Sequence, residues 1–237
     1  MNKDFQFKQF IIRQNKTAMK VGTDGVLLGS WVRINAKADR ILDIGTGTGL
    51  IALMIAQRSA AKIIDAVELN KEAYQQSVEN FKENNWSDRL SCYQTSFQEF
   101  SNQMQSDYDL IVSNPPFYIE TQETVLRDRS MARHSNHLPS NELLLGVSRL
   151  LNKKGSCAFI IPFREQDNFI TLAHKNALFP SRVTHVRGNN AAIIKRSLLQ
   201  FSFVKRKAIR DELVIENSRH IYTKDYIELV KDFYLKM

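Results

Sequence analysis

The chain has 237 residues, of which 43% are apolar and 24% charged, a composition typical of one globular domain with appendages. It excludes wholesale disorder, a collagen-like repeat and a small disulfide-stapled protein. Cys92 and Cys157 lie far apart in apolar or β-prone stretches, so we expect small buried side chains in a reducing compartment. The N-terminus lacks the apolar core of a secretory signal, and no apolar run is long enough to cross a membrane. These features predict a soluble, cytoplasmic protein.

The net charge of +8 is unevenly distributed along the chain. Residues 40–117 carry more acids than bases, whereas residues 1–39 and 118–237 are basic. The stretch from Arg187 to Arg210 contains bases and no acid. This clustering favours a polyanionic partner such as nucleic acid. A basic surface that is merely solvated is the alternative.

Strands and helices alternate from Arg40 onward. In chain order, the pattern predicts a strand at Arg40–Ile44, a helix at Leu50–Arg58, a strand at Lys62–Val67, a helix at Lys71–Glu83, strands at Leu90–Thr95 and Tyr108–Ser113, a helix at Ser140–Leu151, a strand at Ser156–Ile161, a helix at Glu165–Asn176, strands at Arg182–Val186, Leu198–Val204 and Leu213–Ile215, and a helix at Thr223–Leu235. Such alternation predicts an α/β fold with a mostly parallel sheet covered on both faces. Val186 and Leu198 are too close for a helical crossover, which predicts an antiparallel hairpin at one edge. In the helix after Lys71, the apolar side is expected to carry Tyr74, Val78 and Phe81.

A glycine loop, Asp43-Ile44-Gly45-Thr46-Gly47-Thr48-Gly49, follows the first predicted strand and opens a helix. Glycines allow a sharp turn and close approach to a ligand at a helix N-terminus. A dinucleotide loop requires a third glycine where Leu50 stands, and the Gly-Lys-Ser/Thr of a Walker loop is missing. Asp43, at the end of an apolar strand, needs backbone N–H groups or a cationic ligand as partner.

Glu68 follows the next predicted strand, where a carboxylate can accept hydrogen bonds from a ribose diol across the crevice. Alternatively, it caps the helix that begins near Lys71. The glycine loop followed by this acid resembles the motif pair of class I S-adenosylmethionine-dependent methyltransferases. The resemblance implies a Rossmann-like, seven-stranded, mostly parallel sheet with an antiparallel edge strand and helices on both faces. It also implies S-adenosylmethionine as cofactor, with its contacts at Asp43, Gly45, Gly47 and Gly49 for the methionine half, Glu68 for the ribose, and Ser96 or Phe97 near the adenine.

Asn114-Pro115-Pro116-Phe117 follows the predicted strand Tyr108–Ser113, at the edge where such sheets place chemistry. The Asn114 amide oxygen and the Pro115 carbonyl are two acceptors whose geometry the prolines restrict. Two acceptors that converge on an NH₂ group suit an amine whose lone pair is delocalised, because they favour a pyramidal nitrogen aimed at a methyl donor. Phe117 offers a flat face to a planar substrate. A stiff turn with a core aromatic is the structural alternative.

This tetrapeptide resembles the NPP[FY] signature of methyltransferases acting on adenine N6, guanine N2 or glutamine N5. The segments Lys20–Trp31 and Tyr222–Lys236 resemble the bacterial family that methylates adenine N6 beside the anticodon of valine tRNA. That family implies an N-terminal segment, residues 1–39, which caps the cofactor site with Thr23 and Asp24 near the methionine amino group. A structural turn followed by a packing helix is the alternative for this segment. Residues 40–237 are the implied methyltransferase domain, including a basic hairpin at 180–210 and a C-terminal helix at 223–235.

Several side chains are candidate RNA contacts. The aromatic rings of Phe117 or Tyr118 suit a splayed base, whereas cations suit phosphates. The candidates besides Phe117 are Tyr118, Arg133, His134, Lys195, Arg196, Lys205, Arg206 and Lys207. The loop that carries Arg133 and His134 either closes over a flipped base or is a salt-bridged surface loop. His134 and His137 lack a third ligand, so we expect no metal site, and nothing implies a protein partner.

The expected function is methyl transfer from S-adenosylmethionine to N6 of an anticodon-loop adenine in tRNA, with Asn114, Pro115 and Phe117 as catalytic residues. The alternatives are a glutamine-N5 methyltransferase of a translation factor and a guanine-N2 rRNA methyltransferase. A non-enzymatic RNA-binding module with a vestigial fold is a third possibility, although its expected damage to the glycine loop or the tetrapeptide is absent from the sequence.

Overall fold

The computed structural model describes residues 4–17, 19–104, 107–116 and 138–236. Its main sheet has nine strands in the order β11-β10-β8-β9-β7-β6-β3-β4-β5. These strands are β3 (Arg40–Ile44), β4 (Ile63–Glu68), β5 (Leu90–Gln94), β6 (Tyr108–Ser113), β7 (Leu151–Pro162), β8 (Phe179–Asn189), β9 (Ile194–Ser202), β10 (Ile209–Ser218) and β11 (Ile221–Tyr222). The helices are α1 (Thr23–Trp31), α2 (Leu50–Arg58), α3 (Lys71–Lys82), α4 (Phe97–Gln103), α6 (Ser140–Leu150), α7 (Gln166–Lys175) and α8 (Lys224–Val230). A separate small sheet pairs β1 (Phe5–Gln6) with β2 (Ile11–Ile12).

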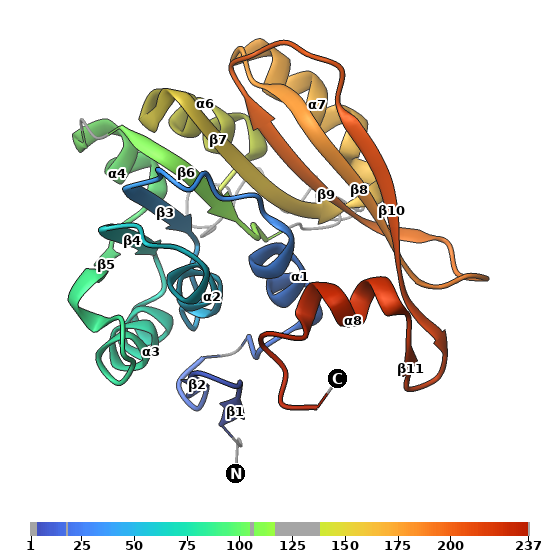
Figure 1. The fold of residues 1–237 in the computed structure, drawn as a ribbon. Helices are drawn as coiled ribbons and strands as arrows, with labels where there is room; N and C mark the ends of the chain where they lie inside the picture. The colour runs from blue at the N-terminus through green and yellow to red at the C-terminus, as the bar shows by residue number, and fades with distance from the viewer. Residues whose placement is uncertain (1–3, 18, 105–106, 117–137, 237) are drawn as a thin grey trace, which may run out of the picture.

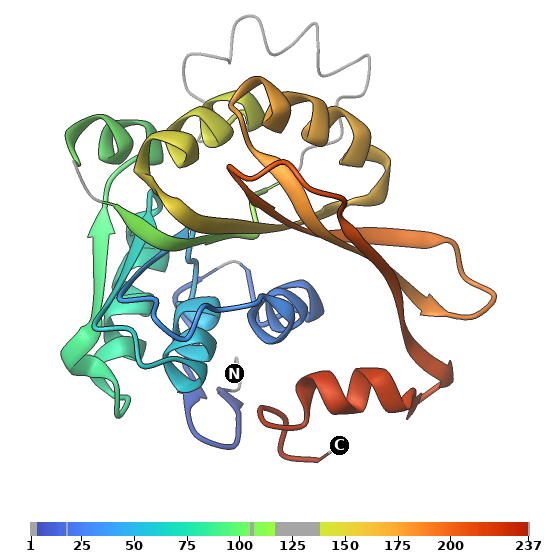
Figure 2. The ribbon, with the colours of Figure 1, turned by 45° about the horizontal axis from the view of Figure 1, so that its top comes forward.

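Helices cover both faces of the main sheet, as Figures 1 and 2 show. One face carries α1, α2 and α8, whose apolar side chains form one buried cluster with residues from the sheet. The other face carries α4, α6 and α7, which form a second buried cluster. Buried strands such as β6, with Leu110, Ile111 and Val112 nearly inaccessible, require cover on both sides. The predicted α/β class is therefore confirmed.

The direction in which strands are added reverses between β3 and β6, and α/β sheets form their ligand crevice at such a switch point. From β3 the chain proceeds to β4 and β5 on one side, and then returns to place β6 parallel to β3 on the other. The Ser113 hydroxyl at the end of β6 donates to the Ile44 carbonyl at the end of β3, at 2.8 Å. Loops after these two strands thus begin side by side at the switch point where α/β sheets bind ligands.

The strand count and the place of the antiparallel strand differ from the seven-stranded expectation. The β8–β9 hairpin forms as predicted, but β9 lies inside the sheet, antiparallel to both β7 and β8. β10 then adds to the free side of β8 as a parallel strand, and β11 forms the edge. β10 is longer than the predicted strand Leu213–Ile215. Only Leu213 within β10 is buried, so the hydrophobic pattern of the sequence underestimates the length of this strand.

Other element limits also differ. α4 was not predicted, and β7 begins five residues earlier than expected, in the polar stretch after Leu151. The buried residues of α3 are Ala73, Gln76, Ser77, Asn80 and Phe81, whereas Tyr74 and Val78 of the expected apolar side are half-buried. Both cysteines are free, Cys157 being buried and Cys92 half-buried, in agreement with their expected role.

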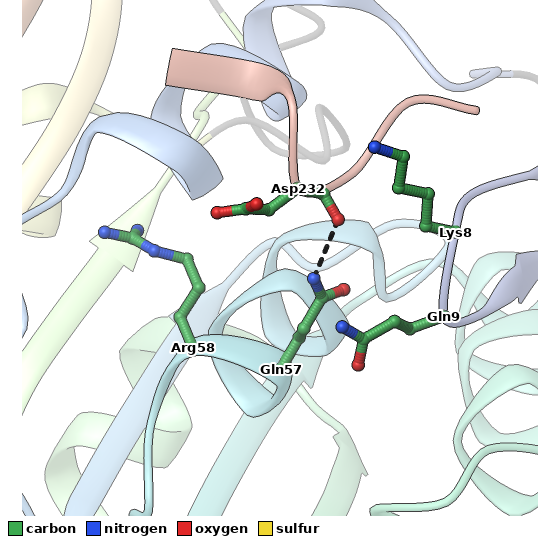
Figure 3. Close-up of a pocket in the computed structure, with 5 residues that line it drawn as sticks. All are labelled: Lys8, Gln9, Gln57, Arg58 and Asp232. Carbon is green, nitrogen blue, oxygen red and sulfur yellow. Dashed lines mark hydrogen bonds between the residues drawn. The ribbon is translucent and has the colours of Figure 1, made fainter. Parts of the chain in front are cut away.

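The N-terminal and C-terminal segments of the chain pack against each other near the end of α2. Phe7 pairs with Tyr234 in an isolated bridge, and the Lys8 ammonium donates to the Lys231 carbonyl at 2.6 Å. Because residues after Val230 pair with the N-terminal segment, the C-terminal helix ends before the predicted Leu235. Figure 3 shows the cavity of about 400 Å³ at this joint, where the Gln57 side chain donates to the Asp232 carbonyl at 3.0 Å. No helix within the described ranges is both long and apolar enough to cross a membrane.

The aromatic cluster at this joint should contribute strongly to stability. Phe7 is 1% exposed and stacks on Phe10, with ring centroids 4.6 Å apart. We expect Phe7→Ala to lower the free energy of unfolding by about 3–5 kcal/mol, because it removes a buried ring and leaves a cavity. Urea denaturation measures this loss. Ile11→Ala is the control, since Ile11 lies in the small sheet beside Phe7 but is 48% exposed, and a comparable loss there would contradict the assignment.

Candidate active site

The glycine loop leaves the end of β3 and leads into α2. Gly45, Gly47 and Gly49 all have positive φ, at 69°, 58° and 84°, a backbone conformation that favours glycine. A Cβ atom added to Gly45 or Gly47 would meet nothing within 4 Å, so open space lies in front of these two residues. At Gly49, by contrast, a Cβ atom would lie 2.5 Å from the Phe81 ring of α3. The loop therefore packs against α3 at one end and presents bare backbone at the other.

Asp43 anchors the loop from below. Its side chain is fully buried, and Oδ2 accepts from the Thr46 hydroxyl at 2.6 Å and from the Ala52 backbone N–H at 3.2 Å. The Oδ1 atom is buried without a hydrogen-bond partner among the described residues. Burial is the main cause that raises the pKa of Asp43 to about 7. The negative charge of Glu68 raises this pKa further, whereas the hydrogen bonds from Thr46 and Ala52 lower it.

Glu68 lies at the end of β4 beside the loop. Its Oε2 accepts from the Gly47 N–H at 2.9 Å, and its Oε1 accepts from the Asn70 N–H at 2.8 Å. Asn70, not Glu68, caps α3, because the Asn70 side chain accepts from the Ala73 N–H at 2.8 Å. The alternative that Glu68 caps α3 is therefore wrong. The Glu68 carboxylate is half-buried and lies against the backbone of the glycine loop.

A buried amide on α3 ties the N-terminal segment to the loop. The Asn80 side chain exchanges two hydrogen bonds with the backbone of Arg13 and donates a third to the Thr48 carbonyl at 2.8 Å. Gln76 likewise accepts from the Lys16 N–H at 3.0 Å. The sequence analysis did not identify Asn80 or Gln76 as structural contacts. Two amides on the inner side of a predicted helix could have indicated them, because buried amides need hydrogen-bond partners.

Of the two candidates at the start of α1, Thr23 is exposed and Asp24 is half-buried. Asp24 forms an ion pair with Arg196 of β9, at 2.8 Å. A predicted cofactor contact and a predicted RNA contact are thus bound to each other. Further along α1, the Trp31 indole N–H donates to the Thr184 hydroxyl of β8 at 2.7 Å. The N-terminal segment therefore contacts both α3 and the second half of the sheet.

Asn114, Pro115 and Pro116 leave the end of β6 at the crevice. Asn114 is half-buried, Pro115 is buried and Pro116 is exposed. The Ser113–Ile44 hydrogen bond places this motif next to the glycine loop. Phe117, Tyr118, Arg133, His134 and His137 lie outside the described residues.

Ser96 and Phe97, the predicted neighbours of the cofactor adenine, have structural partners. Ser96 is the N-cap of α4 and forms a capping box with Glu99. The Phe97 ring is 5% exposed and packs against Gly146 of α6. A cofactor contact at either residue stays a prediction.

The candidate RNA-binding cations fall at opposite ends of the sheet. Lys195 and Arg196 lie near the start of β9, level with Pro162 at the carboxyl end of β7. Lys205, Arg206 and Lys207 follow the end of β9, where Ser202 pairs with Ser156, six residues before Pro162 in β7. Only the first pair is on the edge that holds the glycine loop and Asn114.

The described residues fit S-adenosylmethionine. Bare loop backbone, the Glu68 carboxylate and the unpartnered Asp43 oxygen surround the end of β3, which suits a ligand with hydroxyls and positive charge. Within the described ranges, no group of three His, Cys, Asp or Glu side chains suits a metal ion.

Asp43 should make the stability of the free protein depend on pH. Its pKa is about 7 in the folded chain against an ordinary value of 3.8, so the folded state keeps a proton that the unfolded state releases. Stability should therefore fall as the pH rises from about 4 to about 7, and then level off. From pH 5 to pH 8 we expect wild type to lose about 2–3 kcal/mol relative to Asp43→Asn, which keeps the acceptor oxygen. Urea denaturation at both pH values measures this difference, and parallel profiles would contradict it.

Comparisons with known proteins bear on this site. The family model described as the methyltransferase small domain matches residues 21–156. A protein of Christiangramia forsetii named tRNA1(Val) (adenine(37)-N6)-methyltransferase is 52% identical over 238 residues, covering 100% of this chain and 99% of its own. A protein of the same name from Flavobacterium psychrophilum is 52% identical over 233 residues, covering 98% and 100%.

Solved structures share the fold. A predicted O-methyltransferase from Agrobacterium tumefaciens superposes with a TM-score of 0.69 at 17% identity, covering 89% of this chain and 96% of its own. A putative RNA methyltransferase from Pyrococcus horikoshii gives 0.51 at 16% identity, covering 70% and 75%. The family match over more than half of the sequence and the full-length identities lead to one assignment. The chain belongs to the methyltransferase small domain family, together with relatives named tRNA1(Val) (adenine(37)-N6)-methyltransferase.

Proposed function

We propose that this protein transfers a methyl group from S-adenosylmethionine to N6 of adenine 37 in a valine tRNA. The observation that carries the proposal is the position of Asn114 and Pro115 at the end of β6, joined through Ser113 to the end of β3 and its glycine loop. Full-length relatives at 52% identity carry this activity in their names. The substrate tRNA would be found in the cytoplasm.

The cofactor would be held by the first half of the sheet. Gly45 and Gly47 offer bare backbone to its methionine half, and the Glu68 carboxylate accepts from its ribose hydroxyls. When bound, S-adenosylmethionine supplies the methyl group and a positive charge beside Asp43. Residues 1–39 would cap this site, because Asn80 holds Arg13 and Thr48 together and Arg196 holds Asp24.

Asn114 and Pro115 would orient the target amine. The Asn114 amide oxygen and the Pro115 carbonyl accept its two hydrogens, which favours a pyramidal nitrogen with an available lone pair. Burial of Pro115 and the restricted φ of both prolines hold the acceptors in place, so catalysis rests on alignment and preorganised dipoles. Phe117 would stack on the adenine.

The tRNA substrate is favoured over the alternatives that share this chemistry. Glutamine-N5 and guanine-N2 enzymes also use an Asn-Pro-Pro motif, but the full-length relatives are named for adenine in tRNA. The net charge of +8 also suits an RNA substrate.

Mass spectrometry of nucleosides tests the function directly. Valine tRNA incubated with the protein and isotopically labelled S-adenosylmethionine should yield labelled N6-methyladenosine. The same transcript with guanine at position 37 should yield none. Label in another nucleoside, or none in either RNA, would refute the proposal.

Asn114→Ala tests the assigned role of the tetrapeptide. We expect the variant to keep its affinity for S-adenosylmethionine and to lose methyl transfer by two or more orders of magnitude, since an acceptor that acts on the amine is removed. Calorimetry and single-turnover assays measure the two effects. Asn102→Ala, an exposed asparagine at the end of α4, is the control, and near-wild-type turnover of Asn114→Ala would remove Asn114 from the mechanism.

A further inference from the structure

Three arginines among the described residues on the catalytic side of the sheet are paired with carboxylates, whereas Lys195 on the same side is exposed and forms no ion pair with a described residue. At the carboxyl ends of the strands, Arg196 pairs with Asp24 at 2.8 Å and Arg187 pairs with Glu212 at 2.7 Å. Arg164, just after β7, pairs with Glu165 at 3.3 Å. Such cations are partly neutralised and offer less to an added phosphate than free ones do.

A second group of cations lies at the opposite, amino ends of β7 and β8. This amino-end cluster consists of Lys153, Lys154, Lys205, Arg206 and Lys207. All five are exposed, and none forms an ion pair with a described residue. The Ser156–Ser202 pairing of β7 with β9 places the two stretches next to each other. Figures 1 and 2 show the β9–β10 connection at the end of the sheet opposite the β8–β9 turn.

A groove of about 930 Å³ borders this cluster. Lys37, Lys153, Lys154 and the Phe203 ring line it together with two carboxylates, Asp107 and Asp109. Asp109 is already used by the fold, because its Oδ2 accepts from the backbone N–H groups of Asp39 and Arg40 at 2.8 and 3.1 Å. The lysines therefore outnumber the acceptors available to them, and the groove continues the positive surface.

We propose that the amino-end cluster binds phosphates of the tRNA outside its anticodon loop. The inference rests on the proposed function. Leu110 of β6 is level with Ser156 and Ser202, so Asn114 lies four residues to one side of that level and Lys205 three residues to the other. At about 3.3 Å per strand residue, the four residues from that level to Asn114 span about 13 Å, and Lys205 follows the end of β9 on the other side of that level. A single RNA that meets both sites must do so through its stem or body.

Two pairs of substitutions test this inference. Lys153→Gln with Lys154→Gln, and Lys205→Gln with Lys207→Gln, each remove two charges from the cluster. Lys82→Gln with Lys236→Gln is the matched control, since both lysines are exposed and lie outside it. Binding is measured across a salt series to full-length valine tRNA and to its isolated anticodon stem-loop.

Each cluster pair should weaken binding of full-length tRNA roughly ten-fold at low salt and lower the slope of log K against log salt by about 2. Stem-loop binding should change no more than in the control pair. Unchanged full-length binding, or equal weakening on both RNAs, would overturn the inference. Labelling of adenine 37 by the wild-type protein tests the proposed function separately, because neither pair alters the crevice between β3 and β6.

Discussion

The buried carboxylate of Asp43 is the constraint on which the glycine loop and the start of α2 depend. It accepts from Thr46 within the loop and from Ala52 within α2, so one side chain sets both the turn and the start of the helix. Burial without a partner for Oδ1 costs free energy in the free protein. A bound cation relieves that cost, and by linkage its binding lowers the pKa of the carboxyl.

α1 connects this cofactor side to the remainder of the sheet. Its first turn reaches β9 through the Asp24–Arg196 ion pair, and its last residue, Trp31, reaches β8 through Thr184. The Arg182 guanidinium also lies over the Trp31 ring, 4.6 Å from the centroid. The position of α1 is therefore fixed by side chains of β8 and β9 at both of its ends.

Features that depend on local chemistry were predictable from the sequence. The glycine loop, Glu68 and Asn114 follow short buried strands whose apolar runs are clear, and the structure brings all three to one crevice. Features that depend on distant pairing were not. β10 is only partly buried, so its hydrophobic pattern does not indicate that it pairs with β8. The basic run from Arg187 to Arg210 reads as one patch, yet β9 passes through it and carries its two ends to opposite edges. The inner face of α3 holds amides because it meets backbone of the N-terminal segment, which periodicity cannot foresee.

Gly49 illustrates how the glycine loop depends on the packing of a neighbouring helix. Two separate obstacles stand against a side chain at this position: the positive φ of 84° and the Phe81 ring. A smaller residue at position 81 would remove the second obstacle and leave the first. A substitution at Phe81 alone therefore does not allow a side chain at position 49, and a smaller residue at position 81 removes the ring that packs against the loop. The conformation of the glycine loop therefore depends on Phe81, a buried residue of α3 that lies outside the loop.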